Sequence, residues 1–173
     1  MSTERYATLA EYNQWANRRL YAAASRLTDE QYRADRGAFF RSVHGTLNHL
    51  LVTDRIWIGR FTGETEVPTP LDTILQESLS DLAAARTEED ARLCGFAASL
   101  DPERIGAPFR YVRGLTGETF EAVLGPTLDH VFNHQTHHRG QVHAMLTGLV
   151  REAPELDLLY FQRETGRGSR KIG

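Results

Sequence analysis

Cysteine and lysine are almost missing from this sequence. Of its 173 residues, Cys94 is the single cysteine and Lys171 is the single lysine. One cysteine cannot form an intrachain disulfide, which argues against a secreted scaffold held together by disulfides. Lys171 lies in the terminal stretch GRGSRKIG, so neither a buried Schiff-base lysine nor a phosphate-binding Walker lysine is expected. We expect Cys94 to behave as a small apolar residue and not as a nucleophile.

Long apolar runs and a strong net charge are missing as well. No stretch approaches 18 uninterrupted apolar residues, so we predict no membrane span. Residues 1–20 lack the basic segment and apolar run of a signal peptide, and we therefore expect a cytoplasmic protein. The 20 basic and 23 acidic residues give a net charge of -3, which argues against broad binding to nucleic acid. The sequence also lacks the motifs of serine hydrolases, P-loop proteins, dinucleotide-binding folds and ferritin-like di-iron proteins.

Apolar residues that recur every three, four or seven positions predict four long helices. The expected ranges are about 4–27, 42–61, 71–100 and 126–147. Residues 28–31 have the spacing of a capping box, which predicts a further short helical turn. Gly63 and Gly148 are expected to end the second and fourth long helices.

The rest of the chain is assigned to connections and a tail. Residues 109–113 and 118–121 flank the turn-rich sequence GLTG, which predicts a short β-hairpin or an irregular connection between the third and fourth helices. The length suits one compact domain. The predicted fold class is therefore all-α: a four-helix bundle over residues 1–165, followed by a disordered tail over residues 166–173.

The seven histidines all fall in the second and fourth predicted helices: His44, His49, His130, His134, His137, His138 and His143. At about 100° per residue, His138 lies roughly 40° from His134, on a face that borders the apolar stripe of the fourth helix. His49 lies on the apolar side of the second helix, about 140° from His44. His143 falls opposite His134 and is expected at the surface. One core-facing histidine can therefore meet a core-facing pair.

His49, His134 and His138 are thus the candidate metal ligands. Two histidines one helical turn apart can share an ion with a third from another helix, and neutral imidazole suits zinc, nickel, copper and iron. The alternative is a set of core histidines held by ordinary hydrogen bonds, because an H-x-x-x-H pair also arises by chance. Burying several unpaired imidazoles costs free energy that a shared ion would offset. Three protein ligands would leave a coordination position open, as in catalytic sites.

The neighbouring residues have more than one interpretation. His130 is an extra ligand, a general base or a structural histidine; it lies one turn before His134, and three such histidines would spread over about 12 Å along the helix. Gln141 either orients a ligand imidazole or a metal-bound water, or is a partly solvated residue. The role of His137 stays open. Arg139 is expected to point away from the site, into an ion pair or an intersubunit contact.

Two further groups stand out by residue type. Three charged residues interrupt the apolar stripe of the third helix and form either an internal network or the border of a pocket: Arg86, Glu89 and Asp90. Three aromatic residues are expected in the core or at an interface: Trp15, Trp57 and Tyr160.

Four segments resemble those of a known family: YNQWANRRL (12–20), LNHLLVTDRIW (47–57), HVFNHQTHHRGQVHAML (130–146) and ELDLLYFQRE (155–164). They are similar to segments of the DinB/YfiT-like family of metal-dependent enzymes. The resemblance covers all but the third helix and residues 101–125. It implies a four-helix bundle, a divalent metal ion on His49, His134 and His138, and a homodimer. Some relatives are transferases or isomerases that use low-molecular-weight thiols such as mycothiol, bacillithiol or glutathione, but the metal motif does not identify a substrate.

Two functions therefore compete. The first is a metal-dependent enzyme that acts on a small-molecule substrate, a thiol-dependent transferase being one option, with zinc or nickel as Lewis acid. The second is a non-catalytic, stress-related metal-binding protein in which the ion is a structural tie. A nuclease or DNA-binding function is disfavoured by the charge balance. The two functions differ in whether an open coordination position faces a pocket.

Overall fold

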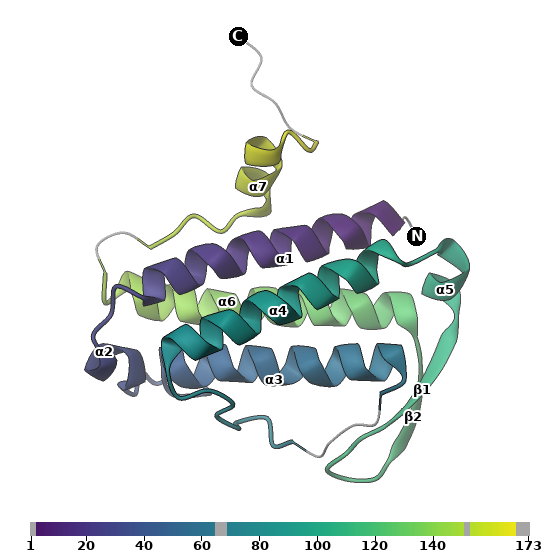
Figure 1. Ribbon diagram of the computed structural model, residues 1–173, viewed down its shortest axis with the longest axis horizontal. Helices are drawn as coiled ribbons and strands as arrows, with labels where there is room; N and C mark the ends of the chain where they lie inside the picture. The colour runs from purple at the N-terminus through teal and green to yellow at the C-terminus, as the bar shows by residue number, and fades with distance from the viewer. Residues whose placement is uncertain (1–2, 65–68, 151–152, 169–173) are drawn as a thin grey trace.

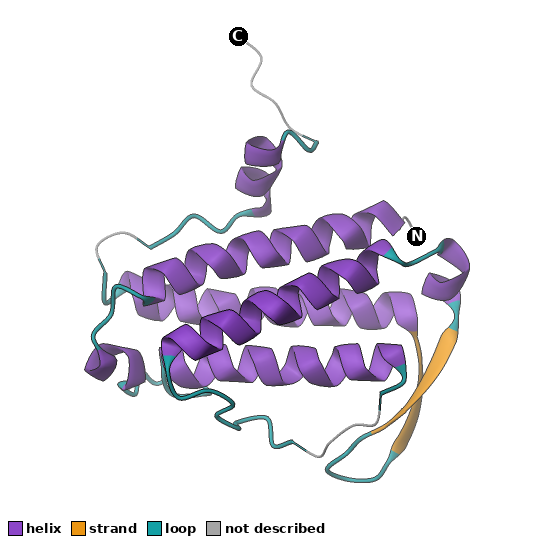
Figure 2. Cartoon of the chain, viewed as in Figure 1, coloured by secondary structure: helices purple, strands orange, loops and turns teal. Residues whose placement is uncertain are grey.

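The computed structural model describes residues 3–64, 69–150 and 153–168. The described chain is mostly helical, with one small two-stranded antiparallel sheet (Figure 2). In chain order the elements are α1 (Thr3–Ala24), α2 (Asp29–Arg33), α3 (Val43–Thr62), α4 (Leu79–Ala98), α5 (Pro102–Gly106), β1 (Pro108–Val112), β2 (Thr119–Val123), α6 (Leu124–Thr147) and α7 (Leu158–Thr165). Within the described ranges, no helix combines the length and apolar character that crossing a bilayer requires.

The four longest helices, α1, α3, α4 and α6, lie side by side (Figure 1). Helices α1 and α3 each pack against both α4 and α6. Buried apolar side chains form one cluster toward each end of these helices, and the two clusters include Leu20, Leu47, Leu82 and Leu146, and Tyr6, Ile58, Leu93 and Leu128. Burying a large apolar side chain contributes about 1.5–3 kcal/mol. Between the clusters each long helix contributes buried polar residues: Asn13, Asn17, Asp54, Arg86, Asp90, Gln135 and Arg139.

Several predicted helix ends are confirmed. Thr28 caps α2 through a capping box, in which its hydroxyl accepts the Gln31 N–H and the Gln31 side chain accepts the Thr28 N–H. Ser42 caps α3 at its start, and Gly63 ends it in the left-handed conformation with a φ of 75°. Helix α6 ends at Thr147, as the sequence predicts.

The third long helix begins later than the sequence predicts. Periodicity gives about 71–100, but α4 begins at Leu79 and ends at Ala98. The stretch before it follows α3 because the buried Asn48 side chain satisfies its backbone. Asn48 Oδ1 accepts the N–H groups of Leu75 and Gln76, and Asn48 Nδ2 donates to the Gln76 carbonyl. A polar side chain on α3 therefore overrides the helical period of this stretch.

The expected hairpin between α4 and α6 is confirmed. Its strands pair antiparallel, from Pro108 opposite Val123 to Val112 opposite Thr119. The hairpin lies beside the C-terminal end of α3 (Figure 1). The sequence did not predict the short helix α5, although Asp101 caps it and Pro102 occupies its first turn, both ordinary start signals.

Helix α6 begins earlier than expected. The sequence predicts a start at Pro126, but the helix begins at Leu124. Strand β2 leads directly into it, and the Leu124 N–H donates to the Ala107 carbonyl just before β1. The hairpin and α6 are therefore joined without a flexible connection, which fixes the hairpin relative to the histidine-bearing helix.

The C-terminal segment packs on α1. Phe161 of α7 is buried against Tyr12 and Trp15, at ring-centroid distances of 5.9 and 5.8 Å. At the start of the predicted disordered tail, Arg167 forms an ion pair with Glu11 at 2.7 Å. Residues 169–173 of that tail lie outside the described residues.

Candidate metal centre

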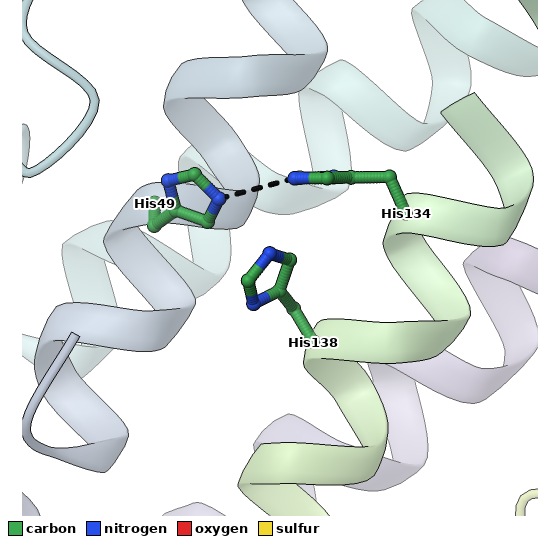
Figure 3. Close-up of side chains that lie close together, drawn as sticks. All are labelled: His49, His134 and His138. Carbon is green, nitrogen blue, oxygen red and sulfur yellow. Dashed lines mark hydrogen bonds between the residues drawn. The ribbon is translucent and has the colours of Figure 1, made fainter. Parts of the chain in front are cut away.

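His49 on α3 and His134 and His138 on α6 lie together in one cluster (Figure 3). One ring nitrogen of each lies within 4.8 Å of those of the other two, close enough for a single metal ion. His49 and His138 are buried and His134 is half-buried. The structure therefore brings together the three residues selected from the sequence.

Helix geometry brings these three rings together, tilted or edge-on to one another. His134 and His138 are one turn apart on α6, so they project from the same side of the helix, and their ring centroids lie 4.4 Å apart. Helix α3 packs along α6 and presents His49 to both, at centroid distances of 5.1 Å from His134 and 4.5 Å from His138. The cluster thus joins two helices at the level of the polar layer of the core.

Hydrogen bonds on the outer side of two rings leave the inner nitrogens free of protons. His49 Nδ1 lies 2.8 Å from the Leu71 carbonyl oxygen, which only accepts, so this nitrogen carries the ring proton. His138 Nδ1 donates to Gln141 Oε1 at 2.8 Å, and Gln141 Nε2 donates to His137 Nε2 at 3.2 Å. The remaining nitrogen of each neutral ring then carries a lone pair that can bind a metal. The hydrogen bond to the outer nitrogen fixes the orientation of the ring.

The spacing of the nitrogens fits a divalent ion. His49 Nε2 lies 3.2 Å from His134 Nε2. Two nitrogens on one tetrahedral zinc, each about 2.0–2.1 Å from the ion, are about 3.3 Å apart. An all-imidazole donor set suits zinc, nickel, copper or iron, and does not by itself choose among them. Three ligands leave a tetrahedral position to be filled from outside the chain.

Burial keeps the three imidazoles neutral. The pKa of His49 is lowered to about 4, mainly by burial. Burial and the neighbouring histidines lower the pKa of His134 to about 3, and burial also lowers the pKa of His138. Since metal binding requires deprotonated imidazole, the cluster is ready for a cation near pH 7 without losing protons.

Phe40 covers one side of the cluster. Its ring stacks on His49 at a centroid distance of 3.7 Å and meets the His138 ring edge-on at 5.5 Å. The ring comes from a turn in which Arg41 has a φ of 66°, a strained value for a residue other than glycine. Gly45 permits this turn, because a Cβ atom at that position would collide with the Phe40 carbonyl oxygen. The turn therefore holds an apolar ring against two of the candidate ligands.

A cavity of about 380 Å³ opens beside His49 and His134. It lies between α3, α6 and the hairpin, and its wall includes Trp57, Arg60, Tyr111, Arg113, Phe120 and His130. A larger hollow of about 710 Å³ lies between α1, α2 and the start of α4, but none of the three clustered histidines lines it. The smaller cavity therefore gives a ligand access to the cluster.

Three residues near the cluster had alternative interpretations. His130 is exposed, lines the cavity and lies with its ring 5.9 Å from that of His134, outside the group of converging nitrogens. Gln141 contacts the imidazole of His138, which is one of the two orienting roles considered for it. His137 is exposed and accepts a hydrogen bond from the Gln141 amide. This hydrogen bond helps to hold the amide in the orientation in which it contacts His138.

His44 and His143 lie outside the cluster as well. His44 is buried, with Nε2 3.1 Å from the Gln76 carbonyl oxygen and Nδ1 3.3 Å from Arg33, so it ties the stretch before α4 to α3. His143 was expected at the surface and is half-buried. Neither contributes a nitrogen to the convergent group.

The charged residues of the third long helix form an internal network, one of the two predicted alternatives. Arg86 forms ion pairs with Asp54 of α3 at 2.7 Å and with Asp90 at 3.1 Å, and all three side chains are at least 97% buried. Asn17 of α1 donates to Asp90 at 2.9 Å. Arg139 points away from the cluster, as predicted. Of its two expected roles, the ion pair is not formed among the described residues, because the buried guanidinium donates to the Asn13 amide oxygen; the intersubunit contact stays a prediction.

Several residues that shape the site were missed in the sequence. Asn48 positions the stretch that offers its carbonyl to His49, and its one signal was a polar residue inside an apolar helix face. Phe40 had no signal, since a positive φ at Arg41 is invisible in the sequence. Tyr111 reaches the cavity because the hairpin folds over α3, which no local pattern predicts.

Helices that bring three neutral imidazoles together beside a cavity define a class: helical proteins with a candidate mononuclear metal site. The chain belongs to the DinB family, whose family model matches residues 1–170. It is 27% identical over 166 residues to Protein DinB of Bacillus subtilis (strain 168), an alignment that covers 91% of this chain and 94% of that relative. The resemblance found in the sequence is therefore confirmed.

Proposed function

We propose that this protein is a metal-dependent enzyme that acts on a small molecule, with one divalent ion, zinc or nickel, held by His49, His134 and His138. The observation that carries the proposal is the convergence of their ring nitrogens within 4.8 Å at the wall of a cavity. A bound ion would supply Lewis-acid chemistry and lower the pKa of water or a thiol bound to it. The residues of the chain orient the imidazoles, cover one side and leave access from the cavity.

The first support is the preorganisation of the ligands. The Leu71 carbonyl and Gln141 each hold the outer nitrogen of a ligand ring, so the inner nitrogens need not reorient to bind. Phe40 closes one side with an apolar ring, whereas the cavity reaches His49 and His134. This asymmetry favours a site that exchanges a ligand through one entrance.

A low-molecular-weight thiol is the co-substrate we propose for a transferase reaction. Cys94 is a poor source of thiolate, because burial raises the pKa of its thiol to about 11. It lies in α4 and packs against the cluster of apolar residues around Leu93. A reactive thiolate at this site would therefore have to be brought in by a small molecule.

The alternative function is a non-catalytic protein in which the ion is a structural tie. This alternative is supported by the location of the three histidines on both α3 and α6. An ion bound to all three would link the two helices. The two functions differ in the coordination shell, since a tie needs no exchangeable position.

Cobalt substitution separates the two functions. The visible spectrum of the cobalt-loaded protein should change on addition of azide, cyanide or a small thiol, because an open position accepts a new ligand. The Phe40→Leu variant, which keeps an apolar cover, serves as a matched control and should respond in the same way. A spectrum unchanged by all of these ligands would contradict the enzyme and favour the tie.

Three further expectations stay proposals. We propose that α1, α3, α4 and α6 form a single four-helix bundle domain, supported by the packing of α1 and α3 against both α4 and α6. We also propose a homodimer on the analogy of the family, for which light scattering showing a 19.5 kDa particle at all micromolar concentrations would be the contrary result. The near absence of cysteine supports a cytoplasmic location.

A further inference from the structure

A series of ring contacts leads from the histidine cluster to the hairpin. The His134 ring lies 5.9 Å from that of His130, measured between ring centroids, and the His130 ring lies 5.5 Å from that of Trp57. Tyr111 lies 5.5 Å from Trp57 on one side and 5.5 Å from Phe120 on the other. All five side chains line the cavity beside the cluster. The cavity therefore has the candidate metal ligands at its inner end and an aromatic wall that extends outward from them.

Part of this wall is apolar surface that the chain itself leaves uncovered. Leu115, between the two strands, is 54% exposed, and Phe120 of β2 is 40% exposed. Both line the cavity, together with the half-buried Ile56 and Trp57 of α3. A ligand that covers apolar surface gains free energy roughly in proportion to the area removed from water. The wall is therefore suited to an apolar group.

The two arginines in the lining are engaged by the chain. The Arg60 guanidinium carbon lies 4.7 Å from the centroid of the Trp57 ring and 4.4 Å from that of the Tyr111 ring. Arg60 thus packs against the aromatic wall and helps to hold both rings. Arg113 forms an ion pair with Glu118 at 3.8 Å. Neither arginine needs a partner from a ligand, so the apolar surface is the feature that a ligand has to match.

The hairpin side of the wall is fixed relative to the histidines. Strand β2 runs directly into α6, and the Leu124 N–H donates to the Ala107 carbonyl oxygen at 3.1 Å. Phe109 of β1 packs against Phe61 of α3 at a ring-centroid distance of 5.5 Å. These contacts anchor the hairpin to both histidine-bearing helices. The wall is therefore preformed, which lowers the entropic cost of binding a ligand.

The volume of the cavity limits the size of its occupant. About 380 Å³ lies at the lower end of the usual range for small-molecule sites, roughly 300–1,000 Å³. The inner end offers the imidazoles of His49 and His134, and the outer wall offers apolar side chains. A small molecule with a polar reacting group at one end and an apolar body about the size of one ring matches both ends.

We propose that the substrate of this protein carries an apolar body, such as an aromatic ring, which contacts Leu115 and Phe120 while its reacting group lies at His49 and His134. This inference rests on the proposed function and names the substrate class of that same site. Leu115 and Phe120 determine specificity: they select for the apolar body and take no part in the reaction.

Two hydroxamates with the same metal-binding group, benzohydroxamate and acetohydroxamate, test the proposal. In titrations of the cobalt-loaded protein followed by its visible spectrum, benzohydroxamate should bind at least about tenfold more tightly, equivalent to about 1.4 kcal/mol. This preference should fall by about threefold in Phe120→Ser and in Leu115→Ser, because each removes apolar contact area, while the affinity for acetohydroxamate stays the same. Val112→Ser is the matched control, because Val112 is 50% exposed on the same hairpin but lies outside the cavity, and it should keep the preference.

Cobalt content and acetohydroxamate binding, measured in every sample, separate this inference from the proposed function. When the protein loads cobalt and binds acetohydroxamate, equal affinity for the two hydroxamates would overturn the apolar-body inference alone. A preference that is unchanged in both Phe120→Ser and Leu115→Ser would do the same. If the wild-type protein loads no cobalt, or loads it and binds neither hydroxamate, the proposed function fails and the inference fails with it.

Discussion

Two polar clusters lie at the same level of the core, and they are built in opposite ways. In the charged network, Arg86 has Asp54 and Asp90 within 3.1 Å, so each charge meets an opposite charge from the chain itself. In the histidine cluster, the inner nitrogens of His49 and His134 face each other at 3.2 Å. One cluster is completed by the protein, and the other is suited to completion by a cation.

Both clusters include residues of α3 and α6, although Arg86 and Asp90 of the charged network lie on α4. On α6, His134 belongs to the histidine cluster, whereas Gln135 beside it donates to Asp54 in the charged network. On α3, His49 and Asp54 divide in the same way. The buried network therefore fixes the position of α3 relative to α6. It thereby also fixes the distance between His49 on α3 and His134 on α6. Ionic groups in a core can thus serve a neighbouring site by fixing its helices.

The largest expected effect comes from breaking the charged network. Arg86→Met leaves Asp54 and Asp90 buried without their cation, so the free energy of unfolding of the metal-free protein should fall by about 3–5 kcal/mol. Arg110→Met, which removes an arginine from an exposed ion pair with Glu121, should cost less than about 1 kcal/mol. Urea denaturation measures both, and equal losses would show that the network has no special role.

Acid should weaken the histidine cluster next most strongly. The pKa of His49 is about 4 in the fold and 6.5 in its ordinary state, so its contribution is complete above pH 6.5 and is lost as the pH falls toward 4. For His49 alone the loss between pH 7 and pH 4 is about 3 kcal/mol in the metal-free protein. His49→Gln should flatten the dependence of stability on pH over this window. Parallel curves for the two proteins would contradict the buried, neutral imidazole.

A smaller effect is expected from displacing the cover over the histidines. Gly45→Ala forces the Phe40 carbonyl away and shifts the ring stacked on His49, at a cost of about 1–3 kcal/mol in stability. Metal affinity should fall by about tenfold, as it does when a supporting contact to a ligand is lost. Gly95→Ala is the control, because a Cβ atom at this position of α4 meets open space. A competition titration in which both variants bind metal like the wild type would remove Phe40 from the site.

The parts of this structure that sequence could predict are those set by local period and capping. His49, His134 and His138 could be chosen because helical spacing alone decides which side chains share a face. Thr28 marked a helix start because its hydroxyl can accept a backbone N–H, and Gly63 marked a helix end because glycine readily adopts a positive φ. The hairpin was found from its turn-rich centre, although α5 before it was overlooked.

The missed features depend on contacts between segments distant in the sequence. The stretch before α4 has a helical period, yet Asn48 on α3 holds it out of a helix. The charge of Arg139 suggested an ion pair. Helix α1 packs against α6, however, and places the Asn13 amide oxygen next to the guanidinium instead. The cavity exists because the hairpin lies over α3, a tertiary contact that neither segment reveals by itself.

Metal content of the untagged protein tests the central claim most directly. Elemental analysis should find about one zinc or nickel ion per chain in the wild type, and near zero in His134→Ala, because the loss of one of three ligands opens the site. His143→Ala, half-buried on the same helix but outside the cluster, should keep about one ion per chain. Full occupancy in His49→Ala, His134→Ala and His138→Ala alike would contradict the three-histidine site.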